Sequence, residues 1–253
     1  MSTIAASRQP LQLHAMPKLL QEALAAHGGH HRWRQFKGMA STIRTGGELW
    51  ALKGAPLIAV PRRASTEFAR QWTQVTPFGQ PDWTMTWTPR HVEITAKDGT
   101  IIAARDDGRD AFDRTFHGQW DPLNLAYFNG YAMWTYHAAP FVFGEPGYVA
   151  REIEATSHEG ATLRGLAVQF PQDVHSHTRE QRFYFDDAGL LRRHDYTVDV
   201  WADTPAAHLI SEYVEVEGMQ FPKRRSVFGI HPDGSLNRAF NPVTIELSEY
   251  TLF

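Results

Sequence analysis

Short apolar runs separated by turn residues dominate the chain beyond residue 40. The first of these runs span residues 43–52, 57–60, 68–75, 82–88 and 91–95, and Gly or Pro stands between each run and the next. Runs of this length with this punctuation are typical of β-strands. The sequence Lys97-Asp98-Gly99-Thr100 is a hairpin turn, so we expect residues 91–96 and 101–105 to pair.

The second half of the chain continues this pattern. Three further turns predict strand pairs: residues 187–189 join 182–186 to 190–201, residues 202–205 lead into 208–216, and residues 217–218 precede 219–227. Because tight turns join successive strands, the predicted sheet is antiparallel.

Two segments have a helical pattern instead. In residues 16–36, Leu19, Leu20, Ala23 and Leu24 recur at spacings near 3.6, and Gly28-Gly29 is expected to end or interrupt the helix. Residues 123–137 are long, aromatic and without alternation, which predicts a buried or groove-lining helix that begins after Asp121-Pro122. With no internal repeat and no linker, the sequence predicts one α+β domain over residues 1–253, with helices covering one face of the sheet.

The composition narrows the functional classes. The chain has 253 residues, of which 42% are hydrophobic and 21% charged, and a formal net charge of −3. This near-neutral balance argues against a non-specific nucleic-acid binder. The absence of cysteine excludes disulfides, thiolate metal sites and cysteine nucleophiles. No apolar stretch predicts a transmembrane segment, and residues 1–10 do not form a recognisable secretory signal, so we expect a cytoplasmic protein.

The predicted aromatic helix is the first candidate binding element. Tyr127, Tyr131 and Trp134 share one helical face by spacing, and Phe128 and Met133 flank that face. Such a face either lines a cavity for a flat or acyl ligand or seals the sheet as ordinary core.

Histidines supply the second candidate. A hairpin centred on residue 188 places His177 opposite Asp199, and a turn centred between residues 203 and 204 places Asp199 opposite His208. Opposite residues have Cβ atoms about 4.5–5.5 Å apart. The cluster predicts a metal site with His175 as a spare ligand, or a histidine base oriented by the carboxylate. The alternative is a set of exposed histidines near the rim of the sheet.

A neighbouring pair extends this candidate. His194 and Tyr196 share a strand face with Val198 and Val200, whereas Asp195 shares the face of Asp199. Both side chains are candidates to point into a cavity as acid–base or hydrogen-bonding groups, and the alternative is that they are satisfied core residues.

Three basic groups remain. Arg62-Arg63, Arg192-Arg193 and Lys223-Arg224-Arg225 are interpreted as solvated strand edges. The alternative is that one of these groups binds a carboxylate or phosphate head group.

Several motifs in the last third of the chain resemble a known family. These are Phe183-Tyr184-Phe185-Asp186, Gly189-Leu190-Leu191 and the run from Glu217 to Pro222. They resemble the LolA/LppX-like lipoprotein carriers, and the stretch from His27 to Tyr196 also resembles uncharacterised bacterial proteins of this length. The carrier resemblance implies a strongly curved antiparallel half-barrel, plugged by helices, that holds an acyl chain.

Together these observations predict binding of a hydrophobic or lipid-like small molecule in the cavity of a curved sheet. Tyr127, Phe128, Tyr131, Trp134 and Tyr196 are the candidate ligand-binding residues. The alternative function is a metal-assisted or cofactor-independent enzyme acting on an apolar small molecule, with His177, Asp199, His208 and His194 as the reacting groups. No glycine-rich nucleotide motif, serine elbow or HExxH sequence is present, so we expect no nucleotide cofactor, while a divalent metal stays open. The oligomeric state stays open as well.

Overall fold

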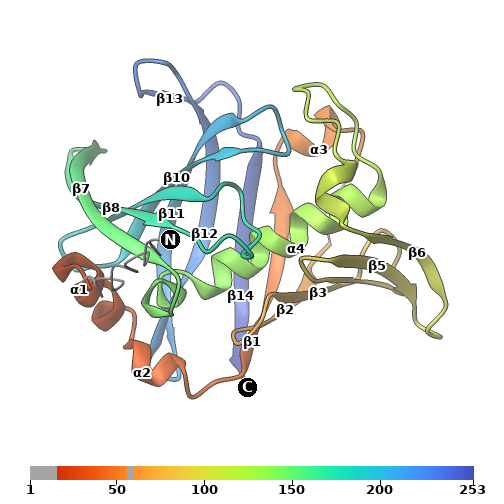
Figure 1. The fold of residues 1–253 in the computed structure, drawn as a ribbon, viewed down its shortest axis with the longest axis horizontal. Helices are drawn as coiled ribbons and strands as arrows, with labels where there is room; N and C mark the ends of the chain where they lie inside the picture. The colour runs from red at the N-terminus through yellow and green to blue at the C-terminus, as the bar shows by residue number, and fades with distance from the viewer. Residues whose placement is uncertain (1–15, 56–59) are drawn as a thin grey trace, which may run out of the picture.

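One continuous antiparallel sheet forms the body of the molecule (Figure 1). The structure is a computed structural model that describes residues 16–55 and 60–253. In sheet order its strands are β6 (Ile101–Asp106), β5 (His91–Ala96), β4 (Trp83–Trp87), β3 (Trp72–Thr76), β2 (Arg62–Glu67), β1 (Gly38–Gly46), β14 (Val243–Leu252), β12 (Met219–Ile230), β11 (Thr204–Val216), β10 (Leu191–Val198), β9 (Glu180–Phe185), β8 (Ala161–Gln169) and β7 (Val149–His158), while β13 (Leu236–Asn237) pairs with β12 outside this row.

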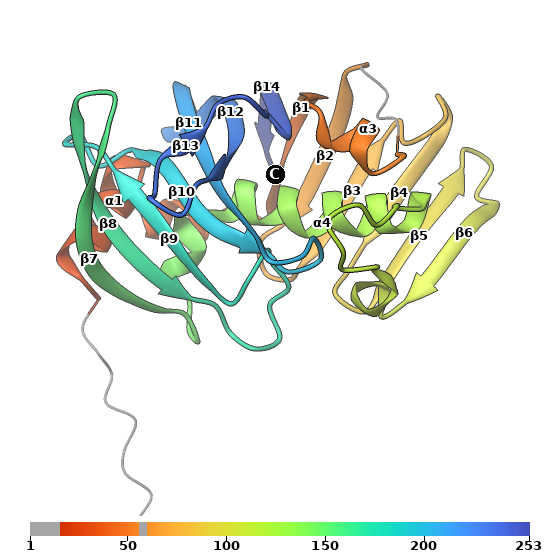
Figure 2. The ribbon, with the colours of Figure 1, turned by 90° about the horizontal axis from the view of Figure 1, so that it is seen from above.

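The sheet is open and strongly curved. Strands β6 and β7 end the row and do not pair with each other, so the sheet does not close into a barrel. Seen from above, it runs from β7 at one end to β6 at the other around a long helix, α4 (Pro122–Ala138) (Figure 2). The predicted α+β class and curved antiparallel sheet are confirmed.

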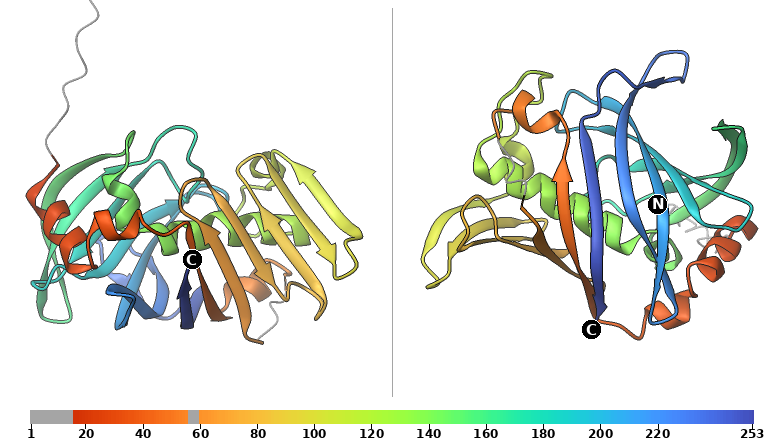
Figure 3. Two further views of the ribbon diagram at one scale, coloured as in Figure 1. Left: turned by 90° about the horizontal axis from the view of Figure 1, so that it is seen from below. Right: turned by 180° about the vertical axis from the view of Figure 1, so that it is seen from behind.

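The shorter helices lie at the margins of the sheet. They are α1 (Lys18–Ala26), α2 (His30–Trp33) and α3 (Leu49–Leu52), and two 3₁₀ turns, η1 (Gly108–Ala111) and η2 (Phe141–Gly144), flank α4 in the chain. Helix α1 packs against β8 and η2 (Figure 3). The predicted interruption of the N-terminal helix is confirmed, because Gly28 and Gly29 adopt φ values of 110° and 94° between α1 and α2.

Helix α4 begins as its sequence predicts. The side chain of Asp121 accepts a hydrogen bond of 2.8 Å from the backbone N–H of Asn124, whose side chain accepts one of 3.2 Å from the N–H of Asp121. Pro122 occupies the first turn, where no N–H donor is needed. Every residue from Leu123 to Ala138 is buried, which explains why the segment shows no amphipathic pattern.

Helix α4 lies close to the sheet at Gly130. Its Cα faces the fully buried ring of Trp87 on β4, and the hydroxyl of Thr73 on β3 donates a hydrogen bond of 2.9 Å to its carbonyl. A Cβ at this position would lie 2.2 Å from Cγ of Trp87. The absence of a side chain at residue 130 therefore sets the distance between helix and sheet.

Several strand predictions need correction. The predicted run 43–52 is a strand only as far as Gly46, because Leu49 and Trp50 turn into the core as part of α3. The predicted run 68–75 begins in the turn before β3, and most of the predicted run 57–60 lies outside the described residues. The apolar pattern did not predict bounds for β7, β8 and β14, because the outward-facing residues of these strands are largely polar.

We expect Gly130→Ala to lower the free energy of unfolding by about 1–3 kcal/mol, because the new methyl group must displace the Trp87 ring. Urea denaturation followed by tryptophan fluorescence measures this. The control is Gly229→Ala, where the nearest atom to a new Cβ is 3.6 Å away and the expected change is within about 0.5 kcal/mol. Equal stabilities of the two variants would contradict the tight contact.

Candidate ligand-binding site

An apolar cleft, which we call the slot, lies between α4 and the inner face of the central strands. It encloses a cavity of about 30 Å³, enough for a water molecule or two. The slot is lined by Thr45, Leu49, Trp50, Phe128, Asn129, Ala132, Met133, Tyr136, Tyr196, Val198, Trp201, Ala206, Val227, Pro242, Val243 and Ile245.

The face of α4 that meets the slot differs from the predicted one. Phe128, Met133 and Tyr136 line the slot, together with Asn129 and Ala132 between them. Of the five predicted ligand-binding residues, Phe128 and Tyr196 therefore border it. Tyr127, Tyr131 and Trp134 are buried but point elsewhere.

These three aromatic residues have other neighbours. The indole N–H of Trp134 donates to the backbone carbonyl of Glu67 at 2.8 Å. The Tyr127 hydroxyl bonds to Nδ1 of His175, and the guanidinium of Arg109 lies over the Tyr131 ring, 5.3 Å from its centroid. Because α4 is buried all round, helical spacing alone could not tell which of its faces borders a cavity.

Two phenols form the polar end of the slot. The Tyr136 hydroxyl lies 2.9 Å from Nε2 of His177 and 3.5 Å from the Tyr196 hydroxyl. Burial raises the pKa of Tyr136 to about 12 and raises that of Tyr196 well above its ordinary value. Both groups are therefore neutral phenols at neutral pH and serve as hydrogen-bonding groups.

Three of the predicted histidines meet beside these phenols. We call His177, His194 and His208 the histidine row. His194 on β10 stands opposite His208 on β11, with ring centroids 6.2 Å apart. His177, from the loop before β9, lies 6.5 Å from His194 and stacks on Tyr196 at 4.0 Å.

Burial keeps this row uncharged. It lowers the pKa of His177 to about 3 and lowers those of His194 and His208 well below the ordinary value. His194 is satisfied by the side chain of Gln181 at 2.6 Å. Both ring nitrogens of His208 and Nδ1 of His177 have no hydrogen-bond partner among the described residues. The histidine row next to Tyr136 and Tyr196 is therefore neutral, and three of its ring nitrogens are unsatisfied.

The predicted pairing of Asp199 with His208 is wrong. Val198 pairs with Thr204, so the β10–β11 turn is centred on Trp201 and His208 faces His194 instead of Asp199. The backbone N–H of Asp199 does bond to the carbonyl of His177 at 3.3 Å, as neighbouring strands would place them. Its carboxylate, however, forms an ion pair of 2.8 Å with Arg109.

The four side chains of the predicted metal site do not come together. His175, His177, His208 and Asp199 do not converge, and the structure gathers no three metal-ligating side chains into one site anywhere in residues 16–55 and 60–253. Within the described part of the chain, no carboxylate contacts the histidine row to orient it.

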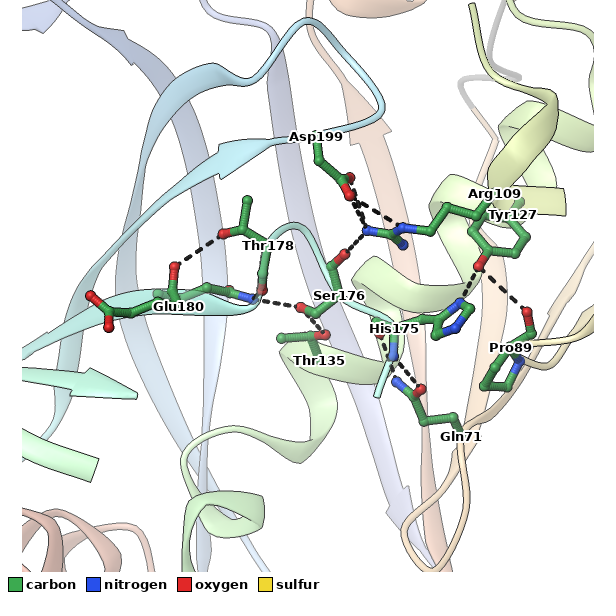
Figure 4. Close-up of polar contacts among 11 residues, drawn as sticks. Gln71, Pro89, Arg109, Tyr127, Thr135, His175, Ser176, Thr178, Glu180 and Asp199 are labelled. Atoms are coloured by element: carbon green, nitrogen blue, oxygen red, sulfur yellow. Dashed lines mark hydrogen bonds and ion pairs between the residues drawn. The ribbon is translucent and has the colours of Figure 1, made fainter. Parts of the chain in front are cut away.

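His175 and His177 belong to the loop between β8 and β9. Figure 4 shows the polar contacts of His175 and Ser176 in this loop. The N–H and carbonyl of His175 both bond to the side chain of Gln71 at 2.7 Å. The carbonyl of Ser176 accepts from Arg109 at 2.6 Å, and its hydroxyl lies 3.0 Å from that of Thr135 on α4. These contacts join the loop to α4, to η1 and to the turn before β3. They hold His177 where its ring contacts Tyr136.

The basic groups are not solvated strand edges, and that interpretation is wrong. Strands β2, β10 and β12 all lie inside the sheet, so successive side chains point to opposite faces. Arg62, Arg193 and Arg225 are buried, whereas Arg224 is exposed. The signal for Arg62 was available, since it alternates with Ala64 and Thr66, and its neighbour Arg63 alternates with Ser65 and Glu67.

Comparison with known proteins bears on the fold. The sequence matches no protein-family model and no curated protein. A DUF1329 family protein from Desulfovibrio piger is similar in structure, with a TM-score of 0.53, 9% identity and coverage of 92% of this chain and 91% of that one. A LolA superfamily protein from Nitrosomonas europaea has a TM-score of 0.48 and 10% identity, with coverage of 92% and 93%.

The chain shares its fold with the DUF1329 family protein. The predicted curved antiparallel half-barrel is confirmed by the strand order, and at 9% identity the likeness to that protein is one of fold. In the described part of the chain, no helix is long and apolar enough to cross a membrane.

Stability is expected to fall in acid because of the histidine row. The pKa of His177 in the folded protein, about 3, lies below the ordinary 6.5, so as pH falls the unfolded chain takes up the proton first. Stability is complete above pH 6.5 and declines below it, by up to about 1.4 kcal/mol per pH unit for each such histidine.

The test compares urea unfolding at pH 7.5 and pH 5.5. In His208→Gln the loss between these pH values should shrink by about 1.4 kcal/mol, because one buried imidazole is gone. The exposed His31→Gln serves as the control and should behave like the parent. An unchanged pH dependence in His208→Gln would contradict burial of a neutral ring at this position.

Proposed function

We propose that this protein binds a hydrophobic small molecule in the slot between α4 and the curved sheet. The observation that carries the proposal is the composition of the slot. Its walls are mostly aromatic and aliphatic, and only a few of its side chains, among them Asn129 and Tyr136, carry polar groups. Apolar walls with a few placed polar groups are the usual character of a small-molecule site.

Binding of an extended chain requires the slot to widen, because its present cavity is only about 30 Å³. Two features favour widening. Met133 is unbranched and flexible, so it can change rotamer at small cost. The end strands β6 and β7 do not pair with each other, so the sheet is not closed and its curvature can change.

A leucine at position 206 should block the slot. Ala206 lies on β11 in the slot wall and is 4% exposed. We expect Ala206→Leu to weaken binding of the fluorescent probe N-phenyl-1-naphthylamine by about tenfold or more, because the added atoms occupy the path of the ligand. Titration of the probe, with its emission as the readout, measures the dissociation constant.

The matched control is Ala104→Leu, which adds the same atoms at an exposed position on β6. Thermal unfolding of both variants checks folding, since overpacking at residue 206 costs about 1–3 kcal/mol. If the parent binds the probe and Ala206→Leu binds it equally well while folded, the slot is not the binding site.

A cofactor-independent enzyme acting on an apolar substrate is the second candidate. The contact of His177 with Tyr136 beside the slot favours it, because a neutral imidazole and a phenol side by side can bind and polarise a substrate oxygen through hydrogen bonds. The two candidates differ in what they require of the histidine row.

For a binding protein, His177→Ala should change the affinity for N-phenyl-1-naphthylamine by no more than about threefold, because the ring does not line the slot and lies behind the lining residues Tyr136 and Tyr196. Fluorescence titration of the variant measures this. A loss of affinity comparable to that of Ala206→Leu would show that the histidine row belongs to the binding surface itself.

A further inference from the structure

The interior of this protein has an uneven distribution of charge. The buried charged side chains of residues 16–55 and 60–253 are Lys53, Arg62, Arg193 and Arg225, and no carboxylate is buried with them. The remaining residues, 1–15 and 56–59, contain no Asp or Glu in their sequence. A buried cation is unfavourable unless protein groups or a bound anion compensate its charge.

Three of these cations are compensated by the protein. The ammonium of Lys53 donates to the carbonyls of Thr115, Phe116 and Gly118 at 3.3, 2.8 and 3.1 Å. Arg193 forms an ion pair of 2.7 Å with Asp195.

Arg225 lies at the C-terminal end of α4. It donates to the carbonyl of Tyr136 at 3.0 Å, and its guanidinium stands over that ring, 4.9 Å from the centroid. The C-terminus of a helix carries partial negative charge, which offsets a cation placed there.

Arg62 has no such compensation. Its side chain is 1% exposed, and its one hydrogen bond goes from Nη2 to the neutral hydroxyl of Thr45 at 2.7 Å. Nε and Nη1 have no partner among the described residues. Burial lowers the pKa of Arg62 to about 10, which leaves the group charged at neutral pH.

Arg62 lies next to the slot. Arg62 on β2 stands opposite Ile43 on β1, and Thr45 follows two residues along β1 on the same inner face. Thr45 is itself part of the slot wall. The hydrogen bond between them therefore places the guanidinium directly behind the wall of an otherwise apolar cleft.

We propose that the ligand of the slot is a single-chain amphiphile with a carboxylate head group, which pairs with Arg62 and Thr45 while its apolar chain lies against α4. This rests on the proposed function. A carboxylate fits because a guanidinium offers a planar pair of donors that matches its two oxygens, and one negative charge balances one cation. One narrow slot beside one cation suits one chain and one head group.

The experiment compares two fluorescent ligands that differ only in the head group, cis-parinaric acid and its methyl ester. On the parent protein we expect the acid to bind about 10- to 100-fold more tightly than the ester, since a hydrogen bond to a charged group is lost in the ester. In Arg62→Met this ratio should fall to about one, with the affinity for the ester unchanged. Arg63→Met is the matched control, because the side chain of Arg63 bonds to the carbonyl of Glu249 at the surface and should leave the ratio as in the parent.

A second measurement keeps the test informative if binding is altered by misfolding. Replacing an unpaired buried charge by an apolar side chain of similar length is neutral or stabilising, so ligand-free Arg62→Met should unfold at or above the temperature of the parent. A clearly lower unfolding temperature would show that the protein itself already satisfies Arg62, which overturns the inference.

The binding outcomes separate the two proposals. If acid and ester bind the parent equally and Arg62→Met changes neither, the carboxylate inference is wrong and hydrophobic binding stands. If neither ligand binds the parent, the proposed function fails and the inference fails with it.

Discussion

The structure depends above all on a helix that must be buried on every side. From Leu123 to Ala138, α4 exposes no residue, and a helix whose apolar side chains are spread over its whole circumference has no face that can be left to water. A flat sheet would cover only one side of it, so the sheet curves around the helix and smaller elements complete the cover. Gly130 against Trp87 sets how near the two layers come, and the slot is the place where this packing leaves space.

Enclosing so much chain also brings polar groups out of water, and the protein handles them in two ways. The histidine row and the phenols of Tyr136 and Tyr196 remain neutral because burial shifts their pKa values away from the physiological range. Cations are not neutralised so easily, and among the described residues all but one of the buried cations contact carbonyls, a carboxylate or a helix end. Arg62 is the exception, because its charge is not compensated by the protein. It lies behind the slot wall, where a bound head group can compensate it in the function that we propose.

The same arrangement explains why the slot and the histidine row adjoin. Both lie on the inner face of β10 and β11, where Tyr196 and Ala206 border the slot and the paired residues His194 and His208 follow on the same face. Tyr136 of α4 contacts both regions. A ligand in the slot would therefore meet an apolar wall along its length and neutral polar atoms at one end, with a cation behind Thr45.

Turn chemistry and apolar spacing were enough to predict the antiparallel sheet, the hairpin at residues 97–100 and the aromatic helix, because these features arise from contacts between residues close in sequence. The same reasoning selected His177, His194 and His208, which do meet, but it placed Asp199 opposite His208 because it centred the β10–β11 turn between residues 203 and 204 instead of on Trp201, and such a shift changes every pairing. Only the tertiary structure decided which face of α4 borders a cavity and which buried arginine lacks a compensating group. Both depend on side chains brought together from strands distant in sequence, and no local pattern in the chain records those contacts.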